Sequence, residues 1–329
     1  MDKLKVLVSG INTKKSNLNG SRASFDNLTI HNVFDLSESK LTEISTNFSL
    51  SNFSLPQTMG YNSLVLYAES SSEEQNYRVA IKILVIEKNN VDTLDSIHKM
   101  VSDNGISPKI FFDCNIDFNS RNYVIKLIMS ERVIPFDDFE WTSITQMKKS
   151  ILTLIEKTLL LHSMDYIHSD IKYENIGLND EGEIYIFDYD NFTEISNSSC
   201  SKIYSSSVCH PPDNLISSSI SHGLGNRIID LFSIVTIILG DIIDIKCWHF
   251  DNEQLSEKRF QITHFKRCNT HKIIQKIIDR KFSKSCSTPF WYSLINFAHD
   301  VFQKNNKIIN KHAFIRRSKK LIKRMKSDL

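Results

Sequence analysis

Four polar side chains in the middle of the chain have the types and the spacing that phosphoryl transfer needs. The sequence HSDIKYEN, residues 168–175, contains Asp170, Lys172 and Asn175, and Asp188 follows an alternating apolar run. A carboxylate on a loop can accept a hydrogen bond from an attacking hydroxyl, and a nearby lysine can neutralise a transferring phosphoryl group. An amide oxygen and a second carboxylate suit Mg²⁺, which prefers oxygen ligands and keeps several waters. These residues therefore indicate a site where Asp170 addresses a hydroxyl and a metal carries phosphates.

A long helix and a short strand have to position these side chains. Apolar residues recur at steps of three and four in residues 143–162, which predicts a helix. Ser143 and Gln146 fit a capping box at its start. The loop with Asp170 follows this helix, and the alternating residues 183–188 predict a strand that ends at the second carboxylate.

A small sheet is predicted upstream of this helix. Four segments are rich in β-branched and aromatic residues, which favours strands, and a fifth has the periodicity of a short helix. The predicted strands cover residues 62–70, 77–87, 108–114 and 122–129, and the predicted helix covers residues 91–103. Apolar helices are expected in the second half of the chain, so the fold class is α+β.

In these motifs the chain resembles the eukaryotic-type serine/threonine protein kinases. HSDIKYEN resembles the catalytic loop H-R-D-x-K-x-x-N, and FDYD at residues 187–190 resembles the metal-binding motif D-F-G. VAIK at residues 79–82 reproduces the signature of the third kinase strand. The motifs occur in family order over roughly residues 56–302. The resemblance implies a protein-kinase-like two-lobed fold, with a small β-rich N-lobe, a mostly α-helical C-lobe and ATP between them.

The resemblance also implies a role for each matching residue. Asp170 would orient a Ser or Thr hydroxyl of a protein substrate and accept its proton, while Lys172 would neutralise charge. Asn175 and Asp188 would bind Mg²⁺, and Lys82 would hold the α- and β-phosphates of ATP.

Further positions match the phosphate loop and the supporting parts of the kinase fold. TMGYNSLV aligns with the loop G-x-G-x-x-G-x-V, PPDNL stands where A-P-E is expected, and DLFS resembles the start of a buried helix that braces the catalytic loop. The implied ATP-binding residues are Thr58, Gly60, Ser63, Val65 and Ala80. The implied supporting residues are Asp95, His168, Asp213 and Asp230.

Four departures from the family pattern leave alternatives open. Ser169 replaces the arginine that, in kinases that have it, binds a phosphate on the activation loop. We therefore expect activity that does not depend on phosphorylation of that loop. Asp95 is the helix acid offered to Lys82 where the family has glutamate, and it fits a solvated helix position equally well. Asp190 replaces the glycine of D-F-G, and only Gly60 remains of the glycine loop. The alternatives are a pseudokinase that acts as a nucleotide-binding scaffold, and a small-molecule kinase of the aminoglycoside or choline kinase type.

Composition suggests three regions along the chain. Residues 1–55 are rich in Ser and Asn and are expected to form a loosely ordered extension. Residues 56–303 would form the kinase-like domain, with the N-lobe at about 56–129 and the C-lobe at about 130–303. Residues 304–329 form a basic tail with ten Lys or Arg residues. The tail could pack on the large lobe as a helix, and its charge could attract an acidic partner.

Bulk properties exclude several other classes. The chain has 329 residues, 41% hydrophobic and 24% charged, with a net charge of +2, so there is no clear nucleic-acid site. Its six cysteines form no C-x-x-C pair, which argues against a zinc site. The apolar residues 228–239 are too few to cross a bilayer and include Asp230, so we expect a buried helix. With no secretion leader, a cytoplasmic location is expected, including a host-cell cytoplasm by analogy with viral or bacterial effector kinases.

Overall fold

The fold is mixed α+β, as the sequence predicted, and the chain divides into two compact units. Unit 1 ends at Val133 and unit 2 begins at Ile134, slightly later than the expected boundary near residue 129. The computed structural model describes residues 30–55, 63–71, 76–118, 120–136, 139–189, 192–195, 226–238, 288–302 and 311–329.

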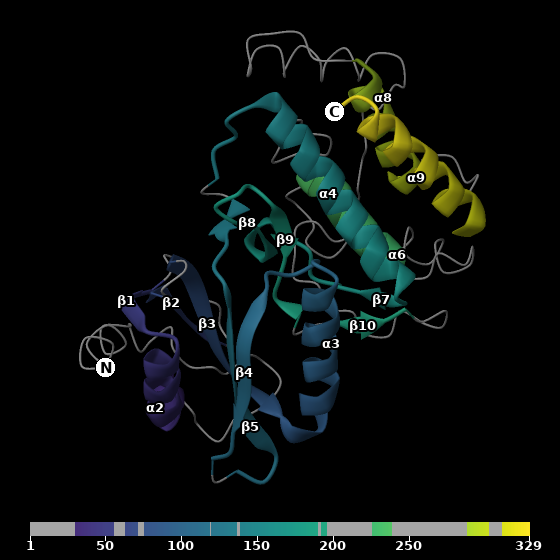
Figure 1. The fold of residues 1–329 in the computed structure, drawn as a ribbon. Helices are drawn as coiled ribbons and strands as arrows, with labels where there is room; N and C mark the ends of the chain where they lie inside the picture. Colours follow the sequence, from purple (N-terminus) through teal and green to yellow (C-terminus); the bar gives the residue numbers. More distant parts are fainter. Residues whose placement is uncertain are drawn as a thin grey trace, which may run out of the picture. The chain divides into compact units, whose positions relative to one another are not determined.

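Unit 1 contains a five-stranded antiparallel sheet in the order β1-β2-β3-β5-β4 (Figure 1). The strands are β1 (Leu50–Ser54), β2 (Ser63–Ser71), β3 (Asn76–Glu87), β4 (Ile110–Ile116) and β5 (Tyr123–Glu131). The helix α3 (Val91–Asp103) joins β3 to β4 after one short 3-10 turn (Lys88–Asn90). The four predicted strands and the predicted helix are therefore confirmed, because alternating and helical apolar patterns were strong in these segments.

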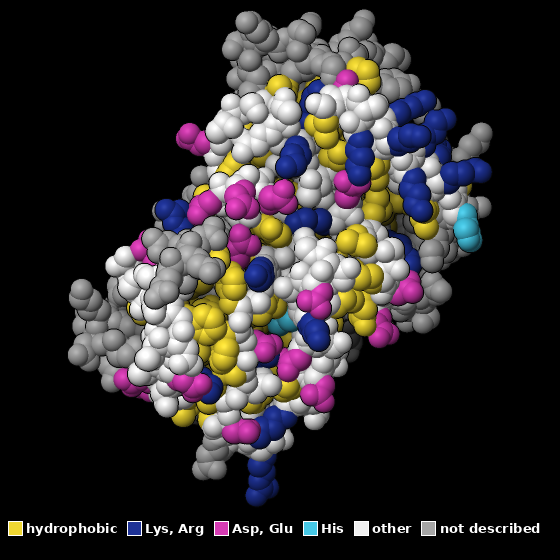
Figure 2. Space-filling model, in the orientation of Figure 1, with side chains coloured by type: hydrophobic (Ala, Val, Ile, Leu, Met, Phe, Trp, Pro, Cys, Tyr) yellow, Lys and Arg dark blue, Asp and Glu magenta, His cyan; other side chains and the backbone are white. Residues whose placement is uncertain are grey.

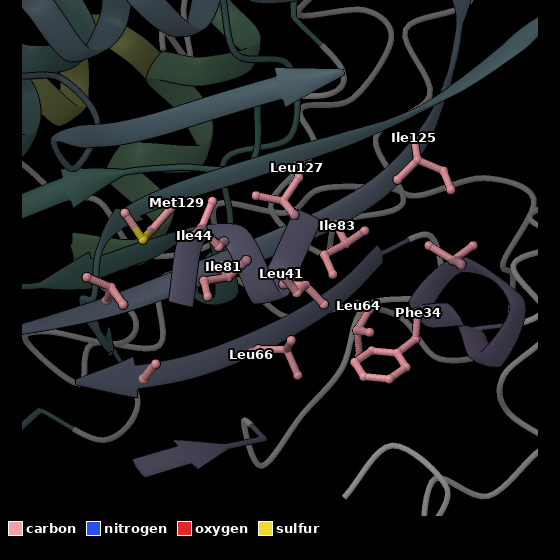
Figure 3. Packing of buried hydrophobic residues seen from close by; sticks show 13 residues of the cluster. Phe34, Leu41, Ile44, Leu64, Leu66, Ile81, Ile83, Ile125, Leu127 and Met129 are labelled. Atoms are coloured by element: carbon pink, nitrogen blue, oxygen red, sulfur yellow. The ribbon is translucent and has the colours of Figure 1, made fainter. Parts of the chain in front are cut away.

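A helix that the sequence analysis did not predict covers one face of this sheet. The helix α2 (Ile30–Asn47) buries Phe34, Leu41 and Ile44 against the sheet (Figure 3). Their partners include Leu64, Leu66, Ile81, Ile83, Ile125, Leu127 and Met129. Each fully buried side chain of this kind contributes roughly 1.5–3 kcal/mol.

The expected extension through residue 55 is therefore corrected for its described part. Residues 30–54 form α2 and β1, and both belong to the sheet and core of unit 1. The physical reason is that apolar residues at helical spacing build a stripe on one face of a helix, even when Ser, Asn and Thr fill many of the other positions. Residues 1–29 lie outside the described residues.

Unit 2 is mostly helical. Its helices are α4 (Ile144–Ser163), α6 (Arg227–Ile237), α8 (Thr288–Phe302) and α9 (Lys311–Lys326). Its short strands are β6 (Ile134–Pro135), β7 (Tyr166–Ile167), β8 (Ile176–Leu178), β9 (Ile184–Ile186) and β10 (Thr193–Glu194). They pair as β10-β7 and as β6-β8-β9, all antiparallel.

The helix α4 begins where the sequence predicted. The Ser143 side chain accepts a hydrogen bond from the backbone N–H of Gln146 at 3.1 Å. The Gln146 side chain in turn accepts from the backbone N–H of Thr142 at 2.9 Å, so the reciprocal contact falls one residue earlier than in a standard capping box.

The apolar helix α6 is buried along its whole length, which confirms the prediction for this segment. Among the described helices, none is both long enough and apolar enough to span a membrane.

The basic C-terminal segment belongs to unit 2 in its described part and is not a separate tail. The helix α9 packs on α8 and α4, and it buries Phe314 and Met325. Just after the helix, Asp328 accepts hydrogen bonds from the Lys148 side chain and the backbone N–H of Phe290, each at 3.1 Å. The expected packing of this segment as a helix is therefore confirmed for residues 311–326, because the apolar face of the helix lies against the rest of unit 2. The described part of the segment is thus continuous with the domain that was expected to end at residue 303. Residues 303–310 lie outside the described residues.

Candidate functional site

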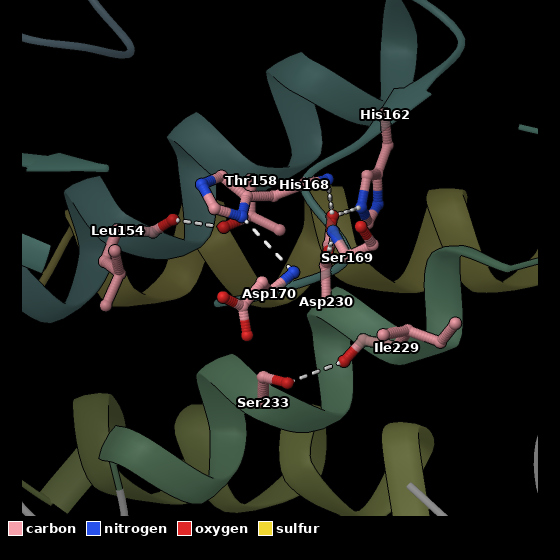
Figure 4. A network of polar contacts seen from close by, with 9 residues as sticks. All are labelled: Leu154, Thr158, His162, His168, Ser169, Asp170, Ile229, Asp230 and Ser233. Atoms are coloured by element: carbon pink, nitrogen blue, oxygen red, sulfur yellow. Dashed lines mark hydrogen bonds and ion pairs between the residues drawn. The ribbon is translucent and has the colours of Figure 1, made fainter. Parts of the chain in front are cut away.

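The loop that contains Asp170 is braced from below by Asp230 on α6. The Asp230 carboxylate is fully buried. One oxygen accepts from the backbone N–H of His168 at 2.8 Å, and the other accepts from the backbone N–H of Ser169 at 2.9 Å. The Nε2 atom of His162, on α4, also lies 3.0 Å from the Asp230 carboxylate (Figure 4). Charge-assisted hydrogen bonds to two successive amides hold the loop in one conformation. Asp230 therefore lies where a supporting residue was expected.

His168 connects the loop to the chain segment after β9. Its Nε2 atom lies 2.9 Å from the carbonyl oxygen of Phe187, and its Nδ1 atom accepts from the backbone N–H of Asp170 at 3.3 Å. A carbonyl can only accept, so Nε2 carries the proton and Nδ1 does not. The Tyr189 ring packs beside the imidazole, with ring centroids 4.9 Å apart. The imidazole is thus engaged on both nitrogens and acts as a structural residue.

Asp170 is buried and has one carboxylate oxygen in use and one without a partner. Its Oδ2 atom accepts from the Lys172 ammonium at 2.8 Å and from the Asn175 side-chain amide at 3.4 Å. Its Oδ1 atom is buried and accepts no hydrogen bond from a described residue. A buried carboxylate oxygen without a donor costs roughly 1–3 kcal/mol or more. Such an atom is a candidate to accept a hydrogen bond from a ligand.

Lys172 places a positive charge 2.8 Å from the Asp170 carboxylate. Burial acts to lower its pKa, but the hydrogen bond that Lys172 donates to Asp170 and the negative charges of Asp170, Asp188 and Glu174 outweigh burial and raise the pKa. The ammonium group is therefore cationic at neutral pH. The same interactions show that Asp188 lies within electrostatic reach of Lys172.

Two residues of the site have a left-handed backbone. Ser169 has φ of 64° and Asp188 has φ of 69°. This region is uncommon for residues with a Cβ atom, and such conformations often persist at functional sites where the surroundings fix them. Here the hydrogen bond that the backbone N–H of Ser169 donates to Asp230 provides that fixation.

Asn175 and Asp188 fit the protein ligands of a magnesium ion whose remaining ligands are phosphate oxygens and waters. The amide nitrogen of Asn175 donates to the carbonyl oxygen of Asp170 at 2.9 Å, which leaves its amide oxygen to a cation. The backbone N–H of Phe187 donates to the carbonyl oxygen of Asn175 at 3.0 Å, so the two segments adjoin. Two protein oxygens suffice for Mg²⁺ because it keeps waters and binds phosphate oxygens. Among the described residues, no three His, Cys, Asp or Glu side chains form a metal-holding group.

In unit 1, four of the predicted ATP-binding residues share one face of the sheet. Val65 on β2 lies directly opposite Lys82 on β3, and Ser63 lies opposite Leu84. Ala80 precedes Lys82 by two residues, so its side chain points to the same face. The apolar core with α2 lies on the other face. Thr58, Gly60, Asp190 and Asp213 lie outside the described residues.

Asp95 forms an ion pair that the sequence analysis did not predict. Its carboxylate lies 2.5 Å from the ammonium of Lys126, a fully buried lysine on β5. Lys126 also contacts Asp113 on β4 at 3.0 Å. Asp95 is therefore not simply a solvated helix residue, since it connects α3 to the sheet. The neighbouring His98 is buried, and burial followed by the charges of Lys82 and Lys126 lowers its pKa to about 4.

The sequence contained only a weak signal for the ion pairs of Lys126 with Asp95 and Asp113. Lys126 interrupts the apolar strand NYVIKLIM, where a lone charge in a buried strand requires a partner. That partner comes from two other elements, which no local pattern reveals.

The chain matches no known protein-family model, and no curated protein matches it.

Proposed function

We propose that this protein is an ATP-dependent protein kinase with the two-lobed protein-kinase-like fold. It would transfer the γ-phosphoryl group of ATP to Ser or Thr hydroxyls of a protein substrate. The observation that carries the proposal is the Asp170 carboxylate, with Oδ2 held by Lys172 and Asn175 and with a buried Oδ1 that accepts no hydrogen bond from the described part of the chain. The antiparallel sheet with one helix in unit 1 and the mostly helical unit 2 are compatible with that fold.

The roles of the residues follow from their chemistry. The substrate hydroxyl donates its hydrogen bond to Oδ1 of Asp170. As its oxygen forms a bond to the γ-phosphorus, the bond to the β,γ-bridging oxygen of ATP breaks and the proton passes to Asp170. Lys172 keeps Asp170 oriented and offsets charge on the transferring group. A lysine two residues after the catalytic acid favours Ser and Thr over Tyr as acceptors, by resemblance to the family.

Metal and nucleotide contacts complete the proposal. Asn175 and Asp188 would hold Mg²⁺, which supplies charge neutralisation on the phosphates. Val65 and Ala80 would provide apolar contacts for the nucleotide base, and Lys82 would contact the phosphates. These three side chains share one face of the unit 1 sheet.

The direct test is phosphate transfer by the purified full-length protein. The protein is incubated with γ-labelled ATP, Mg²⁺ and a generic basic protein, and the label in protein is measured. We expect transfer by the unchanged protein and a loss of at least about 100-fold in Asp170→Asn, since general acid–base catalysis contributes roughly 10²–10⁴-fold. Asp188→Ala should also lose transfer, because it removes a ligand of the Mg²⁺ that neutralises the phosphates. Asp180→Asn is the matched control, because Asp180 is exposed on the β8–β9 turn.

Different outcomes separate the alternatives. A thermal shift with ATP but no transfer, unchanged in Asp170→Asn, would indicate a nucleotide-binding scaffold. Transfer to an aminoglycoside or to choline, with none to protein, would indicate a small-molecule kinase. Equal transfer by Asp170→Asn and the unchanged protein would contradict the assignment of the catalytic acid.

A further inference from the structure

One face of α9 carries a continuous row of basic side chains. At about 100° per residue, five of them span an arc of roughly 140° on the helix surface. They are Arg316, Lys319, Lys320, Lys323 and Arg324, and all are exposed. We name these five residues the basic ridge. Figure 2 shows Lys and Arg side chains gathered over the position of α9 in Figure 1.

The opposite face of α9 is apolar and packed. Its side chains are directed to the body of unit 2, where α9 lies against α8. The buried residues are Phe314, Leu321, Ile322 and Met325. The basic ridge therefore lies on the face of α9 opposite its contacts with the described helices of unit 2, and the apolar face is not available to an external partner.

The charge of the basic ridge is not neutralised within the described part of the protein. The two flanking cations have acidic partners: Arg317 pairs with Asp300 and Lys326 with Glu156, each at 2.6 Å. None of the five ridge residues forms an ion pair with a described residue, and α9 contains no Asp or Glu. Five like charges within about two turns repel one another, so an anionic surface would stabilise the ridge.

We infer that the basic ridge binds the anionic surface of a phospholipid membrane through charge alone. A membrane presents a plane of phosphate headgroups, and a row of side chains that protrudes from a protein can reach such a plane along its whole length. Clusters of four to eight basic residues on a helix are typical of binding to anionic lipids. Because the apolar face of α9 is buried, the helix rests on the headgroups and does not insert into the acyl chains.

The composition of the ridge argues against a folded protein as the partner. The centres of protein interfaces are depleted of lysine and depend on aromatic or aliphatic anchors. The aromatic side chain of α9, Phe314, is buried, and the exposed apolar residue beside the ridge is Ile315, with 36% of its surface exposed. Such a ridge offers charge but no anchor.

Nucleic acid is less well matched than a membrane for a similar reason. Single-stranded nucleic acid is bound by basic grooves with aromatic stacking platforms, and the ridge has neither. Sequence-specific duplex readout also uses Asn or Gln on adenine edges, and the ridge contains neither.

Vesicle flotation of the full-length protein tests this inference and does not depend on phosphoryl transfer. We expect the protein to float with phosphatidylcholine vesicles that contain phosphatidylserine and to remain unbound with phosphatidylcholine alone. Binding should weaken as salt is added, because the screening length shortens to about 8 Å at physiological ionic strength. Each ridge charge contributes about fivefold to the partition constant.

Two matched triple variants distinguish the ridge from net charge. One neutralises three ridge residues and should lower the partition constant by roughly 100-fold. The other removes the same charge from three exposed residues of unit 1 and should bind like the unchanged protein. The ridge variant is Lys319→Gln, Lys320→Gln and Lys323→Gln. The control variant is Lys99→Gln, Lys109→Gln and Arg121→Gln.

Three results would overturn the inference. The first is equal flotation with both vesicle types, and the second is equal binding by the two triple variants. The third is binding of a random duplex DNA, lost in the ridge variant, without binding to anionic vesicles. Circular dichroism should show that the ridge variant keeps the helix content of the unchanged protein. If the variant has lost helix content, the salt dependence of flotation by the unchanged protein tests the inference, since salt-independent flotation contradicts binding by charge.

Discussion

His98 is expected to make unit 1 less stable as the pH falls from about 6.5 to about 4. The imidazole lies on the buried face of α3 and is 7% exposed. Burial lowers its pKa from 6.5 to about 4, supported by Lys82 and Lys126 and opposed by Asp95 and Asp113. Since the pKa is lower in the folded state, the unfolded chain binds the proton more readily. The contribution of the neutral His98 imidazole to the stability of unit 1 is therefore complete at neutral pH, and it is lost as the pH falls from about 6.5 to about 4.

The magnitude follows from the difference in pKa. One pKa unit corresponds to about 1.4 kcal/mol, so the shift from 6.5 to about 4 lowers the free energy of unfolding by up to about 3.5 kcal/mol. At about pH 4.5 the folded state is still mostly unprotonated, and the loss relative to neutral pH is about 2.5 kcal/mol. Typical domains have about 5–15 kcal/mol in total, so the change is large enough to measure.

The assay compares the unchanged protein with His98→Asn, which removes the titrating ring. Urea unfolding is followed by hydrogen exchange in peptides from α3 and β5, because Trp141, Trp248 and Trp291 all belong to unit 2 and tryptophan fluorescence does not report on unit 1. The difference in unfolding free energy between the two proteins should shrink by about 2.5 kcal/mol from neutral pH to about pH 4.5.

A control and a contrary outcome complete the test. His312→Asn changes an exposed histidine of unit 2 and should leave the pH dependence of unit 1 unaltered. If the unchanged protein and His98→Asn lose the same stability over this pH range, the argument from burial is refuted.

Three further substitutions test other parts of the structure. Leu41→Ala should lower the stability of unit 1 by about 2–5 kcal/mol because it leaves a cavity under α2, while Leu36→Ala, at an exposed position, should change it by less than about 0.5 kcal/mol; hydrogen exchange in unit 1 measures both. Asp230→Ala removes the acceptor of two buried backbone amides and should lower the unfolding free energy of unit 2 by about 2 kcal/mol or more, measured by tryptophan fluorescence in urea. Phosphate transfer should also fall under conditions where the variant is still folded, and an unchanged unfolding free energy would contradict the bracing role. Lys126→Met should cost unit 1 about 1–2 kcal/mol, less than a fully buried pair because Asp95 is partly exposed, and exchange in α3 should accelerate; unaltered exchange would argue against the tether.

The strands of unit 1 and the helix α4 could be predicted because their patterns are local. Alternation in β2 and β3 and the three-to-four-residue spacing in α4 are each set by a single segment. The grouping of Asp170, Lys172 and Asn175 was predictable for the same reason, since they lie within one short loop.

What could not be predicted depends on contacts between distant segments. The helix α2 has few apolar positions, and their burial becomes evident only when the sheet face that they cover is known. The ion pairs of Lys126 join β5 to α3 and β4, so its burial at 0% exposure could not follow from its own strand. The left-handed backbone of Ser169 likewise depends on Asp230, which is far away in the sequence.

The position of α2 on the sheet has a practical meaning for work with shortened forms of this protein. A recombinant protein that starts at Pro56 would lack α2 and β1. The apolar face of the sheet that α2 covers would then be exposed to solvent, and β2 would become an unpaired edge strand. Surfaces and edges of that kind promote aggregation. A start before Ile30 retains this built-in shield, and the polar composition of the first residues is thus a poor guide to where the protein can be trimmed.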